Sequence, residues 1–120
     1  MSKQIQVSAH MKIRQGKLED FMRHAGAIIA QAKAKDPGTL RYDWFLSSDK
    51  TECEVREAYE SSEALLAHVF NIRELIRTLF DKYATDHSIV IYGDPSPDIL
   101  QRAAAMGVKV KVHSFLQGLA

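Results

Sequence analysis

The stretch EAYESSEALLAH, residues 57–68, marks a point where a strand runs directly into a helix. Glu57 and Tyr59 are two residues apart, so they share one face of a strand. The serine pair that follows offers a helix N-cap, and His68 falls on the apolar face of that helix. The sequence therefore predicts that a carboxylate, a phenol and an imidazole meet where a helix packs on a sheet.

Apolar residues recur with the periods of strands and helices along the rest of the chain. Alternation predicts strands at 5–13, 39–47, 52–59, 87–92 and 108–113. Spacings of three and four predict helices at 17–35, at 62–83 with a pause near Asn71, and at 98–106. The order β-α-β-β-α-β is the split βαβ, or ferredoxin-like, arrangement, with one antiparallel sheet under two helices. We expect a single α+β domain over residues 1–120, with an added helix and strand.

Composition narrows the class of protein. The chain has 120 residues and a net charge of +1 from 16 basic and 15 acidic residues, which gives no basic patch for nucleic acid or anionic lipid. The N-terminal residues lack the apolar core of a secretory signal, and no run approaches the length of a membrane span. The single Cys53 cannot form an internal disulfide. These features predict a cytoplasmic protein with neither a membrane nor a nucleic-acid partner.

The face of the sheet opposite the helices is too apolar for a sheet face that is exposed to solvent. Alternation places Phe45, Val90 and Tyr92 on that face, and Phe115 follows the last predicted strand. A patch of this kind marks an interface, and a two-fold axis is the usual solution for identical subunits. We therefore expect a homodimer in which two sheets pack face to face. Whether the last strand exchanges between subunits is left open by the sequence.

Three motifs resemble those of a known family. They are QGKLEDF at 15–21, DPGTLRY at 36–42, and EAYESSEA at 57–64 with His68 after it. With these motifs the chain resembles the antibiotic biosynthesis monooxygenase-like proteins of the dimeric α+β barrel superfamily. The resemblance implies a pocket between sheet and helices, where a substrate enolate or phenolate reacts with oxygen without metal or flavin. The residues that match such a pocket by place are Trp44, Tyr59, His68 and Asn71.

The superfamily also includes haem-degrading enzymes, and this chain departs from their pattern. In the haem-degrading branch of the superfamily that this chain resembles, the pattern has an Asn on the first strand and a Trp at the end of the third strand. Here Ser8 and His10 lie on the first strand, and Tyr59 stands in place of the tryptophan. Haem degradation is therefore not expected.

Two titratable residues are the candidate catalytic groups, and each also has a structural interpretation. His68 titrates near neutrality, so it suits a base that takes a proton from a phenol or enol, but it also suits a hydrogen-bonded core position. Strand alternation places Glu57 on the core side, where a carboxylate must be paired with a partner, protonated or solvated. It would either orient His68 or form a structural pair with His68, Tyr59 or an arginine.

The candidate substrate-binding residues are Trp44, Tyr59, Tyr42 and Asn71. The aromatic side chains offer a flat apolar wall with the indole N–H or phenol O–H as a polar group. They would serve equally well as ordinary residues of the hydrophobic core. Asn71 also suits a helix interruption. The remaining histidines, His10, His24, His87 and His113, match no zinc spacing, so no metal site and no cofactor are expected.

Three functional hypotheses fit these residues. The first is cofactor-independent monooxygenation of a quinol or polyphenol-like small molecule, with His68 as base and Glu57 as its orienting partner. The second is a non-catalytic or stress-responsive dimer that binds a small aromatic ligand. The third is an isomerase of a small keto compound, which would use the same pair to move protons and would need no oxygen.

Overall fold

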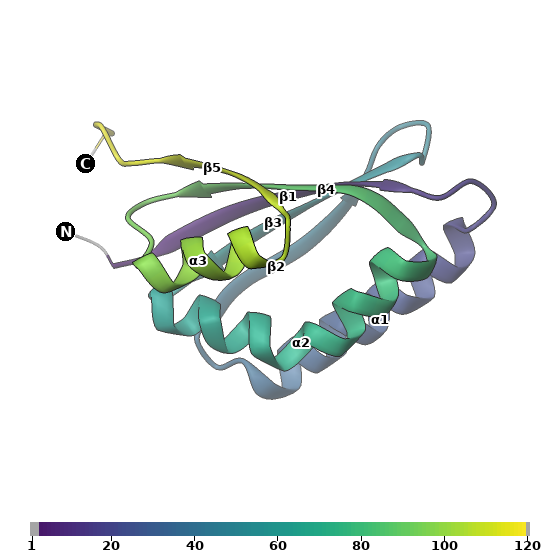
Figure 1. The fold of residues 1–120 in the computed structure, drawn as a ribbon, viewed down its shortest axis with the longest axis horizontal. Coiled ribbons are helices and arrows are strands. Elements are labelled where there is room, and N and C mark those ends of the chain that lie inside the picture. The colour runs from purple at the N-terminus through teal and green to yellow at the C-terminus, as the bar shows by residue number, and fades with distance from the viewer. Residues whose placement is uncertain (1–2, 120) are drawn as a thin grey trace.

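The computed structural model describes residues 3–119, which fold into five strands and three helices (Figure 1). In chain order they are β1 (Ile5–Ile13), α1 (Leu18–Lys35), β2 (Thr39–Leu46), β3 (Glu52–Tyr59), α2 (Ser62–Lys82), β4 (Ala84–Tyr92), α3 (Pro97–Ala105) and β5 (Lys109–His113). The predicted α+β ferredoxin-like fold is confirmed.

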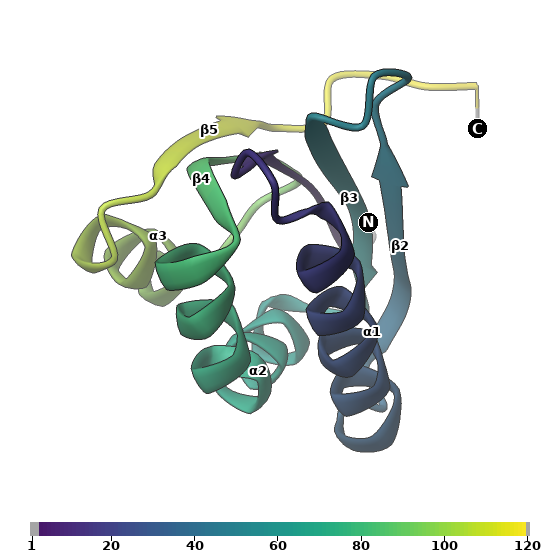
Figure 2. The ribbon, with the colours of Figure 1, turned by 90° about the vertical axis from the view of Figure 1, so that its right-hand side faces the viewer.

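All five strands belong to one sheet, in the order β2-β3-β1-β4-β5. The first four strands pair antiparallel, and β5 extends the sheet by pairing parallel to β4. A parallel neighbour needs a crossover connection, which α3 supplies. The three helices lie on the same side of the sheet, and within residues 3–119 the other face carries no helix (Figures 1 and 2).

The core fills the layer between the helices and the inward face of the sheet. Along β3, Cys53, Val55 and Tyr59 are buried, whereas Arg56 is exposed. This alternation confirms that the odd-numbered residues of the strand face the helices. The helices bury one stripe each, and the stripes include Phe21, Ala25, Ile28 and Ala32 on α1 and Leu65, His68, Ile72 and Leu79 on α2.

One predicted helix interruption and one predicted strand boundary were wrong. The helix α2 runs without a pause through Asn71, because the Asn71 side chain bonds to the end of α1 instead of its own backbone. The strand β4 begins at Ala84, three residues earlier than expected. Ala84 and Thr85 pair with the end of β1 across a register shift, and Asp86 takes a left-handed conformation (φ 56°) there.

The outward face of the sheet combines a polar network with exposed aromatic residues. Glu54 accepts a hydrogen bond from Ser8 and contacts His10 and Arg56. Beside this network, Phe45 and Tyr92 keep 48% and 41% of their surface exposed, and Phe115 keeps 75%. Within residues 3–119, none of the helices combines the length and apolar character that crossing a membrane requires.

Candidate functional site

The turn between α1 and β2 places an acidic side chain beneath the sheet. Asp36 ends α1, with its backbone N–H donating to the carbonyl of Ala32. Pro37 and Gly38 then turn the chain, since the residue before a proline leaves the helical region. Gly38 lies so close to α2 that a β-carbon there would be 2.7 Å from the Cβ of Ala64. The turn is therefore pressed against the first turn of α2, and Asp36 faces that helix.

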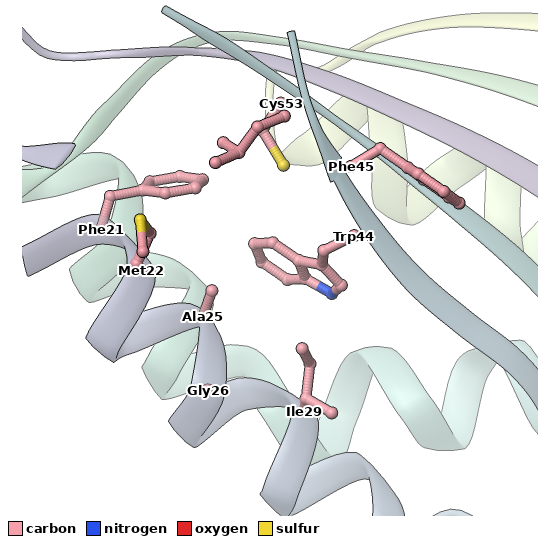
Figure 3. A pocket seen from close by; sticks show the side chains of 9 residues that line it. Phe21, Met22, Ala25, Gly26, Ile29, Trp44, Phe45 and Cys53 are labelled. Atoms are coloured by element: carbon pink, nitrogen blue, oxygen red, sulfur yellow. The ribbon is translucent and has the colours of Figure 1, made fainter. Parts of the chain in front are cut away.

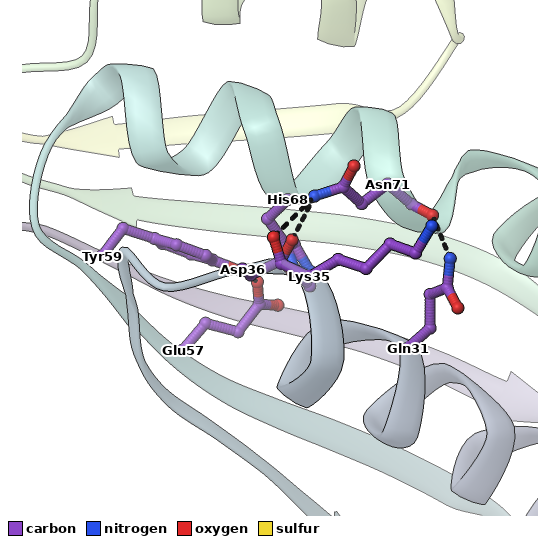
Figure 4. Close-up of polar contacts among 7 residues, drawn as sticks. All are labelled: Gln31, Lys35, Asp36, Glu57, Tyr59, His68 and Asn71. Carbon is purple, nitrogen blue, oxygen red and sulfur yellow. Dashed lines mark hydrogen bonds and ion pairs between the residues drawn. The ribbon is translucent and has the colours of Figure 1, made fainter.

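Asp36 and His68 form a buried hydrogen-bonded pair (Figure 4). The Oδ2 atom of Asp36 lies 2.6 Å from Nδ1 of His68, and the two side chains are 1% and 3% exposed. Asn71 donates from Nδ2 to the second carboxylate oxygen and to the backbone carbonyl of Lys35. Because an ionised carboxylate only accepts hydrogen bonds, Nδ1 carries the proton and Nε2 is left as the basic atom.

Burial lowers the pKa of His68 below its ordinary value, although the hydrogen bond and charge of Asp36 act in the opposite direction. The imidazole is therefore neutral at neutral pH. A neutral imidazole with one nitrogen held by a carboxylate is able to accept a proton at the other nitrogen.

Two tyrosine rings flank the imidazole. The ring of Tyr42 on β2 packs edge-on against His68 with centroids 4.6 Å apart, and the buried Tyr59 ring lies 5.3 Å away. Trp44 continues the wall, with its ring 5.8 Å from that of Tyr42. Burial, and after it the Glu57 carboxyl, holds the pKa of Tyr42 well above its usual value, so this phenol remains protonated.

Glu57 lies on the helix-facing side of β3 but does not pair with His68 among the described contacts. Its Oε1 atom accepts a hydrogen bond from the Tyr59 hydroxyl (Figure 4). Burial raises the pKa of the Glu57 carboxyl to about 7, and the bond from Tyr59 opposes this rise. Asp36 thus takes the orienting place beside His68 that the sequence suggested for Glu57, which corrects that expectation.

Two shallow hollows run along the groove between α1 and β2. The first, of about 230 Å³, is lined by residues that include Phe21, Met22, Ala25, Ile29, Trp44 and Cys53 (Figure 3). The second, of about 280 Å³, is lined by residues that include Ile29, Lys33, Asp36, Thr39, Arg41 and Tyr42.

Asp36 and Tyr42 line the second hollow and both contact His68, so they stand between this hollow and the imidazole. His68, Glu57, Tyr59 and Asn71 line neither hollow. The structure therefore brings the predicted residues Tyr42, Tyr59, His68 and Asn71 around one point, with Glu57 one contact further away behind Tyr59. Within the described part of the chain, no three His, Cys, Asp or Glu side chains are grouped as metal ligands would be.

Asp36 is the site residue that sequence reasoning missed. In the sequence, Asp36-Pro37-Gly38 is typical of the end of a helix. Helix termination alone explains these three residues, so the local sequence gives Asp36 no further role. The only available signal was the motif DPGTLRY itself, in which the aspartate precedes a turn that leads into the strand of Tyr42 and Trp44.

A family model described as antibiotic biosynthesis monooxygenase matches residues 5–71. The chain belongs to the antibiotic biosynthesis monooxygenase family. The matched span runs from β1 into α2 and contains Asp36, Tyr42, Glu57, His68 and Asn71. Membership supports a monooxygenase-type activity.

Solved structures share the fold of this family member. The crystal structure of MupZ from Pseudomonas fluorescens aligns with a TM-score of 0.80 at 21% identity, over 99% of this chain and 95% of that one. A protein assigned as an antibiotic biosynthesis monooxygenase from Nitrosomonas europaea aligns at 0.69 and 24% identity, over 81% and 95%. One from Caulobacter crescentus aligns at 0.68 and 25%, over 75% and 88%. A search of curated proteins finds no match.

Proposed function

We propose that this protein is a cofactor-independent monooxygenase that acts on a quinol or polyphenol-like small molecule. The observation that carries the proposal is the buried Asp36–His68 pair, enclosed by the rings of Tyr42 and Tyr59. Family membership supports the oxygenase chemistry, and the pair supplies the base that such chemistry needs.

The first step is removal of a phenolic proton by Nε2 of His68. Asp36 holds the proton on Nδ1, so the imidazole stays in the tautomer that accepts at Nε2. As the imidazolium forms, its charge is stabilised by the carboxylate 2.6 Å away. The resulting phenolate is electron-rich at the ring carbon that reacts with oxygen.

Oxygen supplies the oxidising equivalents in the second step. The phenolate gives electrons to O₂, and a C–O bond forms at the activated ring carbon. That carbon then loses its hydrogen as the O–O bond breaks. One oxygen atom remains as the quinone carbonyl and the other leaves as water, so a phenol and O₂ give a quinone and H₂O.

In this second step the proton held by His68 and the ring hydrogen leave in the water, and Glu57 would relay one of them. Its raised pKa keeps a fraction of the carboxyl protonated near pH 7, and the hydrogen bond with Tyr59 links it to the ring beside His68. Trp44 and Tyr42 would form the wall against which the substrate ring lies. Asn71 would act through Asp36, whose second oxygen it holds.

Oxygen uptake with a panel of quinols tests the proposal. We expect turnover by the unaltered protein and a loss of at least about 100-fold in His68→Gln, with His10→Gln as a control for histidine loss on the far face of the sheet. Equal turnover in both variants would remove His68 from the reaction and the proposal with it.

Two alternatives are separated by the same assay. An isomerase on this site would consume a keto substrate at the same rate under nitrogen. A ligand-binding protein without activity is favoured by one observation, that His68 lines neither hollow. Binding of a quinol with no oxygen uptake would support that alternative.

We further propose that the protein is a homodimer whose outward sheet faces pack together. The exposed aromatic side chains of Phe45, Tyr92 and Phe115 support this. Sedimentation of the unaltered protein and of Tyr92→Lys tests it, since a charge buried in such an interface should give monomers. A monomer in the unaltered protein at micromolar concentration would refute the dimer.

A further inference from the structure

The groove between α1 and β2 has two ends of different chemistry. At one end, Phe21, Met22 and Trp44 form an apolar hollow of about 230 Å³. At the other end, the hollow of about 280 Å³ has Lys33 and Arg41 in its lining together with the hydroxyl-bearing Thr39. Ile29 lines both hollows, so they adjoin along the same helix and the same strand.

The size of the groove favours a small molecule over a protein segment. Pockets for drug-sized ligands hold roughly 300–1,000 Å³, and each hollow alone falls below that range. Joined at Ile29, they reach it. At the apolar end, Met22 and Ile29 keep 51% and 37% of their surface exposed. A bound ligand would cover this apolar surface.

The polar end carries more free positive than negative charge. Lys33 lies in the last turn of α1 and has no ion pair among the described residues. Arg41 contacts Asp43 at 2.8 Å, but both side chains are half exposed, and exposed pairs are weak. The acid that lines this hollow, Asp36, is already held by His68 and Asn71.

Arg41 lines this end from the edge of the sheet. The pairing of β2 with β3 shifts register between Thr39 and Arg41, and after the shift Arg41 pairs with Ala58 and Tyr42 with Glu57, so their side chains alternate between the two faces. Both residues line the hollow because β2 is the outermost strand of the sheet on this side. The hydroxyl oxygen of Thr39 is buried there with no hydrogen-bond partner among the described residues.

From these observations we propose that the two hollows form one groove that binds a small amphipathic anion. Its carboxylate lies against Lys33 and Arg41, and its apolar body lies against Ile29, Met22 and Trp44. This inference deepens the proposed function, because the charged end is the end that reaches Asp36 and Tyr42. The substrate is then a hydroxylated aromatic acid, whose ring hydroxyl lies toward His68.

The test compares a charged probe with its neutral counterpart. Titration calorimetry with 1-hydroxy-2-naphthoate and with its methyl ester should show the acid bound at least about tenfold tighter, as a charge-assisted contact gives. The double variant Lys33→Met with Arg41→Met should bind the acid only as well as the ester. Lys35→Met, which removes a charge from the same helical turn but outside the lining, should keep the preference.

A second variant tests the apolar end without threatening the fold. Gly26 lines the first hollow, and a side chain added there meets nothing within 4 Å. Gly26→Leu should therefore fill the hollow and weaken both probes by about tenfold, while the thermal midpoint stays the same or rises, because leucine is a better helix former than glycine.

The inference fails if acid and ester bind equally to the unaltered protein, or if Lys35→Met weakens binding of the acid as much as the double variant Lys33→Met with Arg41→Met does. It also fails if Gly26→Leu changes neither affinity. These outcomes are independent of turnover. Binding of the acid without oxygen uptake would retain the groove and refute the monooxygenase, whereas oxygen uptake with no preference for the acid would do the reverse.

Discussion

The Asp36 carboxylate and the His68 imidazole meet at 2.6 Å, although 32 residues separate them in the sequence. Asp36 ends α1 and His68 lies near the start of α2, so one contact joins the two helices under the sheet. Both side chains are almost fully buried. A buried pair is costly unless its geometry is good and its remaining atoms are bonded, and Asn71 meets the second requirement.

Asp36→Asn tests whether this contact serves the reaction. The amide has no charge to stabilise the imidazolium, so we expect oxygen uptake to fall by about 100-fold or more. The variant also removes the group that raises the pKa of His68, so the acidic limb of the rate profile should move to lower pH. Asp81→Asn, at an exposed position of α2, is the control. An unchanged profile would mean that the pair is structural only.

Glu57→Gln should stabilise the protein above neutral pH. Burial raises the pKa of Glu57 from 4.5 to about 7, so the folded state keeps a proton that the unfolded state releases in that interval. Stability from this group is therefore present at low pH and is lost as pH rises through about 7. The loss amounts to at most about 3 kcal/mol, and partial exposure of Glu57 reduces it.

Urea unfolding at about pH 4.5 and about pH 8 measures this effect. Glu57→Gln should match the unaltered protein at the lower pH and exceed it at the higher pH, since glutamine still accepts a bond from Tyr59. Glu60→Gln, an exposed change three residues away, should leave both values as they are. If Glu57→Gln is no more stable than the unaltered protein at the higher pH, the Glu57 carboxyl is exposed to solvent and not buried.

His87→Phe should make the fold more resistant to acid. Burial lowers the pKa of His87 from 6.5 to about 4, so the unfolded state binds the proton first. This contribution to stability is complete above about pH 6.5 and is lost as pH falls through about 4. Phenylalanine keeps the stack on Phe80, whose ring centroid is 4.3 Å away.

The free energy of unfolding, followed between about pH 7 and about pH 4, should therefore fall less steeply in His87→Phe. His113→Phe is a matched control, because His113 also stacks on an aromatic ring, that of Tyr92, but is exposed. Equal slopes in the two variants would count against a buried neutral His87.

Gly38→Ala should destabilise the turn that carries Asp36. The added β-carbon would lie 2.7 Å from Cβ of Ala64, and overpacking of this kind costs about 1–3 kcal/mol. Ala64→Gly alone costs about 1 kcal/mol, but combined with Gly38→Ala it removes the clash. The double variant should therefore be more stable than the sum of the single changes, by about 0.5–3 kcal/mol. Additive effects would show that the turn is not pressed against α2.

The order of the elements and the burial pattern could be predicted because both depend on local periodicity. Alternation in β3 places Glu57 and Tyr59 beside the helices, and the structure places them there. The bounds of α1 and β3 differ from expectation by at most one residue. The start of β4 was missed, because Ala84 and Asp86 have little strand propensity and the pairing of Ala84 and Thr85 with β1 extends the strand to this point.

The partner of His68 could not be predicted, since no local pattern links residues 36 and 68. The expectation chose Glu57, the nearest inward carboxylate by strand parity. The structure brings in Asp36 through a turn whose sequence is explained by helix termination alone. Asn71 shows the same limit, because its side chain reaches across to α1 at Lys35 and Asp36. Contacts between elements decided both cases.

Trp44 is the single tryptophan of the chain, and it stands in the wall of the groove, 6.0 Å from the ring of Phe21 and 5.8 Å from that of Tyr42. The molecule thus contains its own optical reporter at the place where a ligand would enter. The emission spectrum of this one indole should respond to occupancy of the groove and to loss of the fold without any attached dye.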